Sequence, residues 1–207
     1  QQERSTLIHA PLFVNQTQVI AKIADSLPDG YNLYVKEHPN MLTRGWREIS
    51  EYKEIMNLPN VTLIHPLAKS LDIIKKSSLV ISIGGTSPLE AAFYNKPSII
   101  LSNQDYSHLP SVHQVETLDE IPNAIQISLK KKVNVSDLNN YLNLVESNSF
   151  KIDLSSLSDD FDRIFHYSGF YADVEIPIDK MENFIKKHWN LYEKLSAEFV
   201  KKIQNDA

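Results

Sequence analysis

The strongest constraint on the fold is a regular alternation, over residues 5–101, between short apolar runs and segments with helical spacing. The runs lie at 5–14, 31–40, 61–66, 79–83 and 97–101. Apolar strands separated by helices are typical of a parallel sheet that helices cover on both faces. We therefore predict an α/β domain with a doubly wound parallel sheet.

Helical spacing fills the intervals between these runs. We predict four helices, at 15–27, 45–57, 69–77 and 87–95. Ser70 is expected to cap the third of them. In the first segment, Val19, Ile20 and Ile23 lie on one helical face, and the sequence Pro-Asp-Gly ends the helix.

The composition changes after residue 129. Residues 130–160 are rich in Asn, Ser, Asp and Lys, and a weak apolar rhythm around Leu138 predicts a short helix between linkers. From Ile178 the apolar residues keep a spacing of three and four, which is typical of an amphipathic helix that packs on another surface. We predict an α/β domain at 1–129, a polar linker with short helices at 130–177, and a C-terminal helix at 178–207.

Composition excludes several classes of site. The 207 residues contain no cysteine, so disulfides, thiolate metal sites and Cys nucleophiles are excluded. A formal net charge of −5 gives no general attraction to nucleic acid, and an anion site must therefore be local. No apolar run approaches the roughly 20 residues of a membrane span, and no signal peptide is visible. We expect the chain in the cytoplasm, including the inner face of the membrane.

Two of the five glycines, Gly84 and Gly85, stand between the apolar run 79–83 and the start of a helix. Glycine in such a place indicates either a tight turn or the close approach of a ligand to the main chain. In open α/β sheets the ligands bind beyond the carboxyl ends of the strands, which is where this turn is expected to lie.

The residues that follow the glycines support two interpretations together. Ser87 as N-cap, Pro88 at the first helical position and Glu90 as the partner in a capping box would start a helix. The same helix start would present backbone N–H groups and the hydroxyls of Thr86 and Ser87 to an anion. We therefore include Gly85, Thr86, Ser87 and Glu90 among the candidate binding residues.

A second group of candidates ends the second and third apolar runs. Lys36 and His38 are two positions apart on one predicted strand, so both point to one side, where they can neutralise a phosphate. Pro39 follows them, and the pair His65 and Pro66 ends the next run, where its backbone can contact a base.

The remaining histidines and aspartates do not combine into a predicted metal site. We expect His9 to lie within the first strand, and His108 and His113 to lie in a loop after the fifth. The D-x-D within "DDFD", at 159–162, falls in a polar linker that enters a helix, where acidic residues are favoured in any case.

The order of these motifs resembles the donor-binding C-terminal domain of GT-B glycosyltransferases, over roughly residues 5–125. It looks most like the bacterial sialyl-, polysialyl- and Kdo capsule transferases, which use CMP-activated acidic sugars. Those enzymes carry a Lys-x-His-Pro or His-Pro motif and a Ser-Ser or Ser-Thr pair, both touching the CMP phosphate. Residues 36–39 match the first motif and 86–87 stand where the second would. The stretch "EAAFYNKPSII" resembles the E-A-x-x-x-G-K-P segment of GT-B domains, with Asn95 where glycine is usual.

The resemblance implies a Rossmann-like domain that binds a nucleotide-sugar as substrate, without metal or cofactor. It implies that His38 is catalytic, by stabilising or protonating the departing phosphate, and that Glu90 holds the ribose hydroxyls. The implied phosphate-binding residues are Lys36, His38, Pro39, Gly85, Thr86 and Ser87, and the implied base-binding loop is His65 and Pro66. The implied acceptor is a polysaccharide or glycolipid of the cell surface.

The chain departs from that family in one respect. The sialyltransferase-like enzymes take their general base from an acidic pair followed by glycine, and the nearest match here, Asp29-Gly30, is a turn preceded by proline. We therefore expect the donor half alone, with the acceptor domain on another segment or subunit and the final helix packing toward it. Three alternatives stay open: a CDP-glycerol transferase of teichoic-acid type, a UDP-N-acetylglucosamine 2-epimerase-like enzyme, and a non-catalytic nucleotide-binding module.

Overall fold

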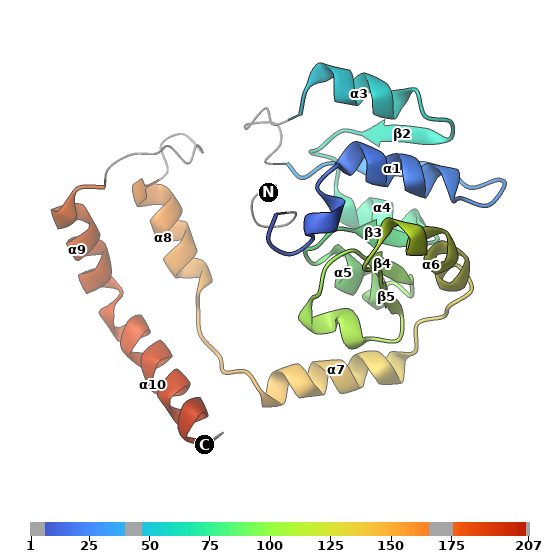
Figure 1. Cartoon of the computed structure of the whole chain (residues 1–207). Helices are drawn as coiled ribbons and strands as arrows, with labels where there is room; N and C mark the ends of the chain where they lie inside the picture. The colour runs from blue at the N-terminus through green and yellow to red at the C-terminus, as the bar shows by residue number, and fades with distance from the viewer. Residues whose placement is uncertain (1–6, 40–46, 166–175, 206–207) are drawn as a thin grey trace. The chain divides into compact units, whose positions relative to one another are not determined.

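The computed structural model describes residues 7–39, 47–165 and 176–205 (Figure 1). The chain divides into two compact units, Gln1–Leu144 and Val145–Ala207. All strands of the described residues lie in the first unit. The domain boundaries predicted at residues 129 and 177 stay predictions.

The first unit is an α/β structure with two small parallel sheets. Strand β1 (Leu33–Lys36) pairs in parallel with β2 (Val61–Ile64). Strands β3 (Val80–Ser82), β4 (Ser98–Ile100) and β5 (Val112–Gln114) form a second parallel sheet in the order β3-β4-β5. The apolar runs at 31–40, 61–66, 79–83 and 97–101 therefore contain strands, as predicted.

The first predicted strand, at 5–14, is wrong over its described part. Residues 7–9 form a turn and Pro11–Phe13 form the 3-10 helix η2. Proline lacks the N–H that a strand ladder needs, which favours the 3-10 turn over a strand. Strand β5 was not predicted, because its three residues include the polar His113 and Gln114 and show no apolar run.

The predicted helices of the first unit are present. They are α1 (Gln16–Asp25), α3 (Ile49–Met56), α4 (Ser70–Lys76) and α5 (Ser87–Phe93), followed by the 3-10 helices η3 (Asp105–His108) and η4 (Leu118–Glu120) and by α6 (Ile121–Ser128). Asn15 caps α1, where its Oδ1 accepts the Gln18 N–H at 3.0 Å. Ser70 does not cap α4 as predicted, because the helix already includes it and Lys69 is the N-cap.

Helices cover both faces of the three-stranded sheet. Ile99 and Ile100 are adjacent in β4, and each is fully buried in a different apolar cluster. Neighbouring strand residues point to opposite faces, so each cluster lies on its own face. The first cluster includes residues of α1 and α6, and the second includes residues of α5 and α7. Leu33 of β1 also packs on the first cluster, as does Ile81 of β3.

The second unit is helical in its described residues. Helix α7 (Val135–Ser147) begins in the first unit and crosses the boundary, and α8 (Ser155–Phe165), α9 (Ile178–Lys187) and α10 (Trp189–Asn205) follow. The C-terminal helix expected from Ile178 is therefore present but is interrupted at His188. Across the described part of the chain, every helix is too short or too polar to cross a membrane.

Candidate functional site

An open hollow of about 640 Å³ lies where β3 and β4 end. Parallel neighbours place their carboxyl ends at the same edge of a sheet, and this edge is where α/β proteins bind ligands. The volume falls within the range of small-molecule sites, roughly 300–1,000 Å³. The lining residues are His9, Gly84, Gly85, Ser102, Asn103, Gln104, Asp105 and His108.

The two glycines that open the hollow meet different requirements. Gly85 has a φ of +85°, a left-handed conformation that residues with a side chain rarely adopt. Gly84 instead lies close to the next loop, and a Cβ there would come within 3.3 Å of the Ser102 Oγ. The turn therefore needs glycine twice, once for its backbone angle and once for close packing against a protein side chain.

Tyr106 joins this turn to the loop after β4. Its ring is buried in the second apolar cluster, and its hydroxyl donates to the carbonyl of Gly85. Burial, with the nearby charge of Asp105, raises the pKa of Tyr106 well above its ordinary value, so the phenol stays a hydrogen-bond donor at neutral pH. Two segments 21 residues apart are thus held together at the rim of the hollow.

The start of α5 differs from the prediction by one residue. Thr86, not Ser87, is the N-cap, with φ −91° and ψ −12°, and Ser87 is the first helical residue. The helix begins earlier because the backbone of Thr86 is already helical. Glu90 does not complete the predicted capping box; its Oε1 accepts the Thr86 hydroxyl at 2.5 Å. Pro88 has no N–H, so the backbone donors at this helix start belong to Ser87 and Leu89.

At the ends of β1 and β2, Lys36 connects the two strand-end loops. Its Nζ donates to the carbonyl of Pro66 at 2.8 Å and to that of Glu37 at 3.2 Å. His65 is exposed, and its Nδ1 accepts the Leu67 N–H at 3.2 Å. The lysine predicted to bind phosphate and the loop predicted to bind a base are therefore in direct contact.

Glu37 points to different partners, as alternation along a strand requires. Its Oε1 accepts the Arg47 Nε at 2.5 Å and its Oε2 accepts the Tyr52 hydroxyl at 2.6 Å. Arg47 also donates from Nη2 to the Gln16 Oε1 at 2.7 Å. The side chains of Arg47 and Glu37 are only 6% and 10% exposed, so this is a buried pair whose charges have several hydrogen-bonding partners. It fixes the backbone between Lys36 and His38.

The imidazole of His38 is close to positive charge. Its pKa is lowered by partial burial and also by the positive charge of Lys36. Because the ordinary value is 6.5, His38 is neutral at pH 7 in the unliganded protein. Pro39, next in the chain, is exposed.

The predicted site residues thus form two groups. The first group lies at the ends of β1 and β2 and consists of Lys36, His38, Pro39, His65 and Pro66. The second group forms the turn and helix start after β3 and consists of Gly85, Thr86, Ser87 and Glu90. Of these residues, Gly85 lines the hollow.

Most residues that line the hollow after β3 and β4 are not among the predicted site residues. His9 was expected inside a strand, but it lies in an exposed turn on the hollow. Residues 102–105 carry no motif, although their position just after an apolar run was a usable signal, because strand ends at one edge meet.

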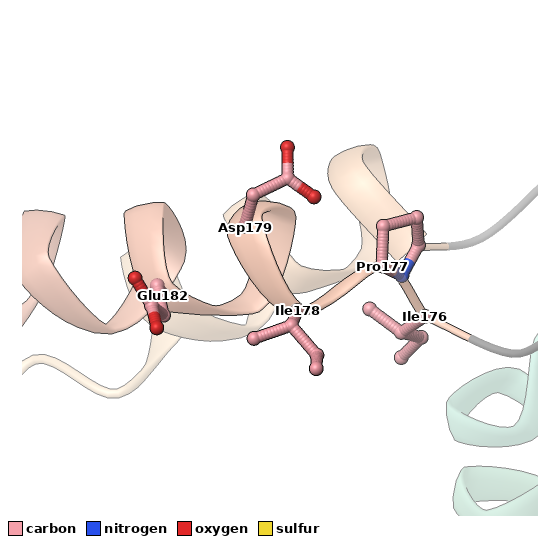
Figure 2. Close-up of a pocket in the computed structure, with 5 residues that line it drawn as sticks. All are labelled: Ile176, Pro177, Ile178, Asp179 and Glu182. Atoms are coloured by element: carbon pink, nitrogen blue, oxygen red, sulfur yellow. The ribbon is translucent and has the colours of Figure 1, made fainter.

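A second hollow, of about 630 Å³, lies at the start of α9. Figure 2 shows its lining, in which Asp179 points away from Ile178. All of its lining residues come from one segment and supply only aliphatic groups and carboxylates. They are Ile176, Pro177, Ile178, Asp179 and Glu182. This hollow is the weaker candidate, because it lacks groups that converge from several elements.

Among the described residues, no three His, Asp or Glu side chains are placed to hold a metal ion. The stretch "DDFD" at 159–162, which contains the D-x-D, lies within α8 rather than at a helix start. Asp160 is engaged there by Arg163, Lys187 and His188.

Comparisons with protein-family models, with curated proteins and with solved structures gave no match. The likeness to glycosyltransferases therefore depends on the sequence motifs alone.

Proposed function

We propose that the chain is the donor-binding half of a metal-independent GT-B glycosyltransferase that uses a nucleotide-activated sugar, with CMP as the nucleotide. The observation that supports this proposal is the gathering of ligand-binding groups at strand ends: Lys36 at the end of β1, in contact with the loop after β2, and an open hollow at the Gly84–Gly85 turn after β3. The acceptor would be a cell-surface polysaccharide or glycolipid, and the enzyme would work in the cytoplasm or at the inner membrane face.

The proposed function includes a more specific fold. The two small sheets would belong to one Rossmann-like sheet in the order β2-β1-β3-β4-β5, wound on both sides by helices. In support, Leu33 of β1 and Ile81 of β3 pack on the same buried cluster. That order would bring the end of β1 next to the end of β3, so that both groups of candidate residues face one ligand.

In the proposed reaction the bond between the sugar and the phosphate breaks, and negative charge accumulates on the departing nucleotide. Cations and N–H or O–H donors aimed at that phosphate stabilise the transition state more than the bound donor. Lys36 would exchange the Pro66 carbonyl for the phosphate, since a hydrogen bond between two charged groups is the stronger one. Thr86 and Ser87 would supply further donors.

His38 would change its protonation state on binding. The donor phosphate, a diester with one negative charge, favours the charged imidazolium, and so does the second charge that develops as the nucleotide departs; both raise the pKa of His38 from its lowered starting value. The imidazolium can then donate its proton to the departing phosphate. Glu90, already oriented by Thr86, would accept hydrogen bonds from the ribose hydroxyls. The general base that activates the acceptor would come from the acceptor half.

Titration calorimetry with CMP, UMP, CDP-glycerol and CMP-N-acetylneuraminic acid tests the proposal. We expect CMP to bind, and Lys36→Ala to weaken it by roughly tenfold to a hundredfold, the value of a hydrogen bond to a charged group. Lys53→Ala, which removes an exposed lysine on α3, is the matched control and should bind as wild type. Absence of nucleotide binding, or equal affinities in the two variants, would contradict the proposal, and preference for CDP-glycerol would reassign the donor.

A further inference from the structure

We propose that the buried pair of Glu37 and Arg47 positions the phosphate site, and that it acts through Lys36 and His38 without contacting the ligand itself. This inference rests on the proposed function for the identity of the ligand. Neither member of the pair is among the predicted site residues, although Glu37 lies between two of them in the sequence.

The pair joins the end of β1 to two helices. Glu37 directly follows β1, Arg47 lies just before α3, and Tyr52 belongs to α3. Arg47 bonds Glu37 through Nε at 2.5 Å and bonds Gln16, the first residue of α1, through Nη2 at 2.7 Å. Tyr52 donates to the other carboxylate oxygen of Glu37 at 2.6 Å, and its ring centre lies 5.8 Å from the guanidinium of Arg47. The orientation of Glu37 is therefore set by groups on separate elements.

The pair is closed to a ligand. Both side chains are almost fully buried. Both carboxylate oxygens of Glu37 are engaged, and Arg47 adds a third contact, from Nη1 to the Glu51 Oε1 at 3.5 Å. A phosphate that drew Arg47 away would leave the buried carboxylate unpaired, which is costly. Arg47 is therefore a structural cation, although arginine is well suited to bind phosphate elsewhere.

The contribution of the pair is direction rather than stability. Desolvation of two charges offsets much of their attraction, and apolar residues of similar volume often replace such a pair without loss of stability. Hydrogen bonds to both oxygens of Glu37 nevertheless fix how its side chain lies. Burial, with the hydrogen bond to Glu37, raises the pKa of Tyr52 above its ordinary 10, so its hydroxyl remains a donor at neutral pH.

Residue 37 passes this orientation to the groups proposed to meet the phosphate. The carbonyl of Glu37 accepts the Lys36 Nζ at 3.2 Å, and the same Nζ donates to the Pro66 carbonyl at 2.8 Å. On the other side, Pro39 restricts His38 to extended backbone conformations. A rotation of residue 37 would therefore move the ammonium of Lys36 and the imidazole of His38 together. In an enzyme site, a displacement of about 1 Å can cost about a hundredfold in rate.

The test replaces the whole pair, Glu37→Leu with Arg47→Met, so that no buried charge is left unpaired. We expect the double variant to stay folded at room temperature and to bind CMP roughly tenfold more weakly, as Lys36→Ala does. In a Lys36→Ala background the same replacement should weaken CMP binding by less than it does in wild type, because the pair acts through that lysine. Glu182→Leu with Lys186→Met removes an exposed pair on α9 and should bind CMP as wild type. Wild-type affinity in the double variant, or an equal loss in both backgrounds, would overturn the inference.

Tyr52→Phe is the milder variant, and it decides the question if the double variant does not fold. It removes the hydroxyl that bonds Glu37 and keeps the ring beside the Arg47 guanidinium. We expect a several-fold loss of CMP affinity, whereas Tyr34→Phe, which removes an exposed hydroxyl on β1, should bind as wild type. Equal affinities of the two variants would contradict the positioning role.

Backbone amide spectra of the unliganded full chain separate this inference from the proposed function. We expect Tyr52→Phe to shift or broaden the amide signals within residues 36–38 and 65–67, because Lys36 joins these two loops. Unchanged signals there would overturn the positioning role even where CMP binds. The expected shifts, together with no binding of CMP by wild type, would remove the nucleotide-dependent function and leave the positioning of this strand end standing.

Discussion

At the scale of single residues, the Gly84–Gly85 turn shows how one dipeptide meets two physical demands. Gly85 has space around it but a φ of +85°, whereas Gly84 lies outside the left-handed region and has a close neighbour in Ser102. A side chain at Gly85 is strained whatever the space, while the hydroxyl near Gly84 can rotate away. The backbone angle at Gly85 is therefore the stricter requirement.

We predict that Gly85→Ala lowers the free energy of unfolding by about 1–2 kcal/mol, the cost of holding an L-residue in the left-handed region. Gly84→Ala should cost less, because a shift of a few tenths of an ångström at Ser102 relieves the contact. Urea unfolding followed by circular dichroism gives both values. A larger loss for Gly84→Ala would show that packing, not φ, governs this turn.

The sequence indicated this turn correctly but not its surroundings. Glycine after an apolar run is a local signal, and so is the S-x-x-E pattern that suggested Ser87 as the cap. In the structure Thr86 is the N-cap instead. Which of the two residues takes that position depends on the backbone angles of Thr86, and both threonine and serine can adopt either conformation. The hydrogen bond from Tyr106 to Gly85 joins segments 21 residues apart, and such a contact leaves no periodic trace in a sequence.

At the scale of elements, one carboxylate joins α8 to α9 and to the residue between α9 and α10. Asp160 on α8 accepts hydrogen bonds from Arg163 and from Lys187 on α9, and its Oδ2 lies 3.0 Å from the Nε2 of His188, between α9 and α10. Its side chain is 16% exposed. Beside it, the rings of Phe161 and Phe184 pack at 5.9 Å. The sequence of residues 159–162 indicates only a polar helix start, because two of the partners of Asp160 lie 27 and 28 residues away.

This cluster predicts a pH dependence of stability. The hydrogen bond from Lys187, followed by the charges of Lys187 and Arg163, lowers the pKa of Asp160 below its ordinary 3.8. A lowered folded-state pKa gives a contribution to stability that is present above 3.8 and is lost as the pH falls through the folded value. Asp160→Asn should therefore lower the melting temperature of the second unit at pH 7, and the difference from wild type should shrink below pH 3.8.

Fluorescence of Trp189, in a background that carries Trp46→Phe, reports the melting of this unit. Asp159→Asn removes the exposed neighbouring carboxylate and should melt as wild type at every pH. A constant difference between Asp160→Asn and wild type across the acid range would show that the ion pairs do not carry the effect.

At the scale of the whole molecule, the strands and both buried clusters lie in the first unit, as do all the candidate site residues. The alternation of apolar runs and helices predicted that α/β unit, because four of the five runs each contain a short strand, whereas the described part of the run at 5–14, which includes Pro11, forms a turn and a 3-10 helix. Its C-terminal limit was harder to predict, since α7 mixes polar residues with exposed apolar ones and buries only Leu138. Leu138 nevertheless belongs to a buried cluster, and the Tyr141 hydroxyl lies 3.4 Å from the Asp105 Oδ2.

Two truncated chains test where the first unit ends. A chain of residues 1–150 keeps all of α7 and should fold and bind CMP with the Kd of the full chain. A chain of residues 1–134 loses α7 and with it the buried Leu138, whose burial is worth about 1.5–3 kcal/mol. Domains of this size are stable by only about 5–15 kcal/mol, so the shorter chain should melt at a clearly lower temperature. Thermal unfolding followed by circular dichroism, with calorimetry for CMP, decides between the two ends. Equal stability of both chains would place the boundary near residue 129 and make α7 an appendage of the second unit.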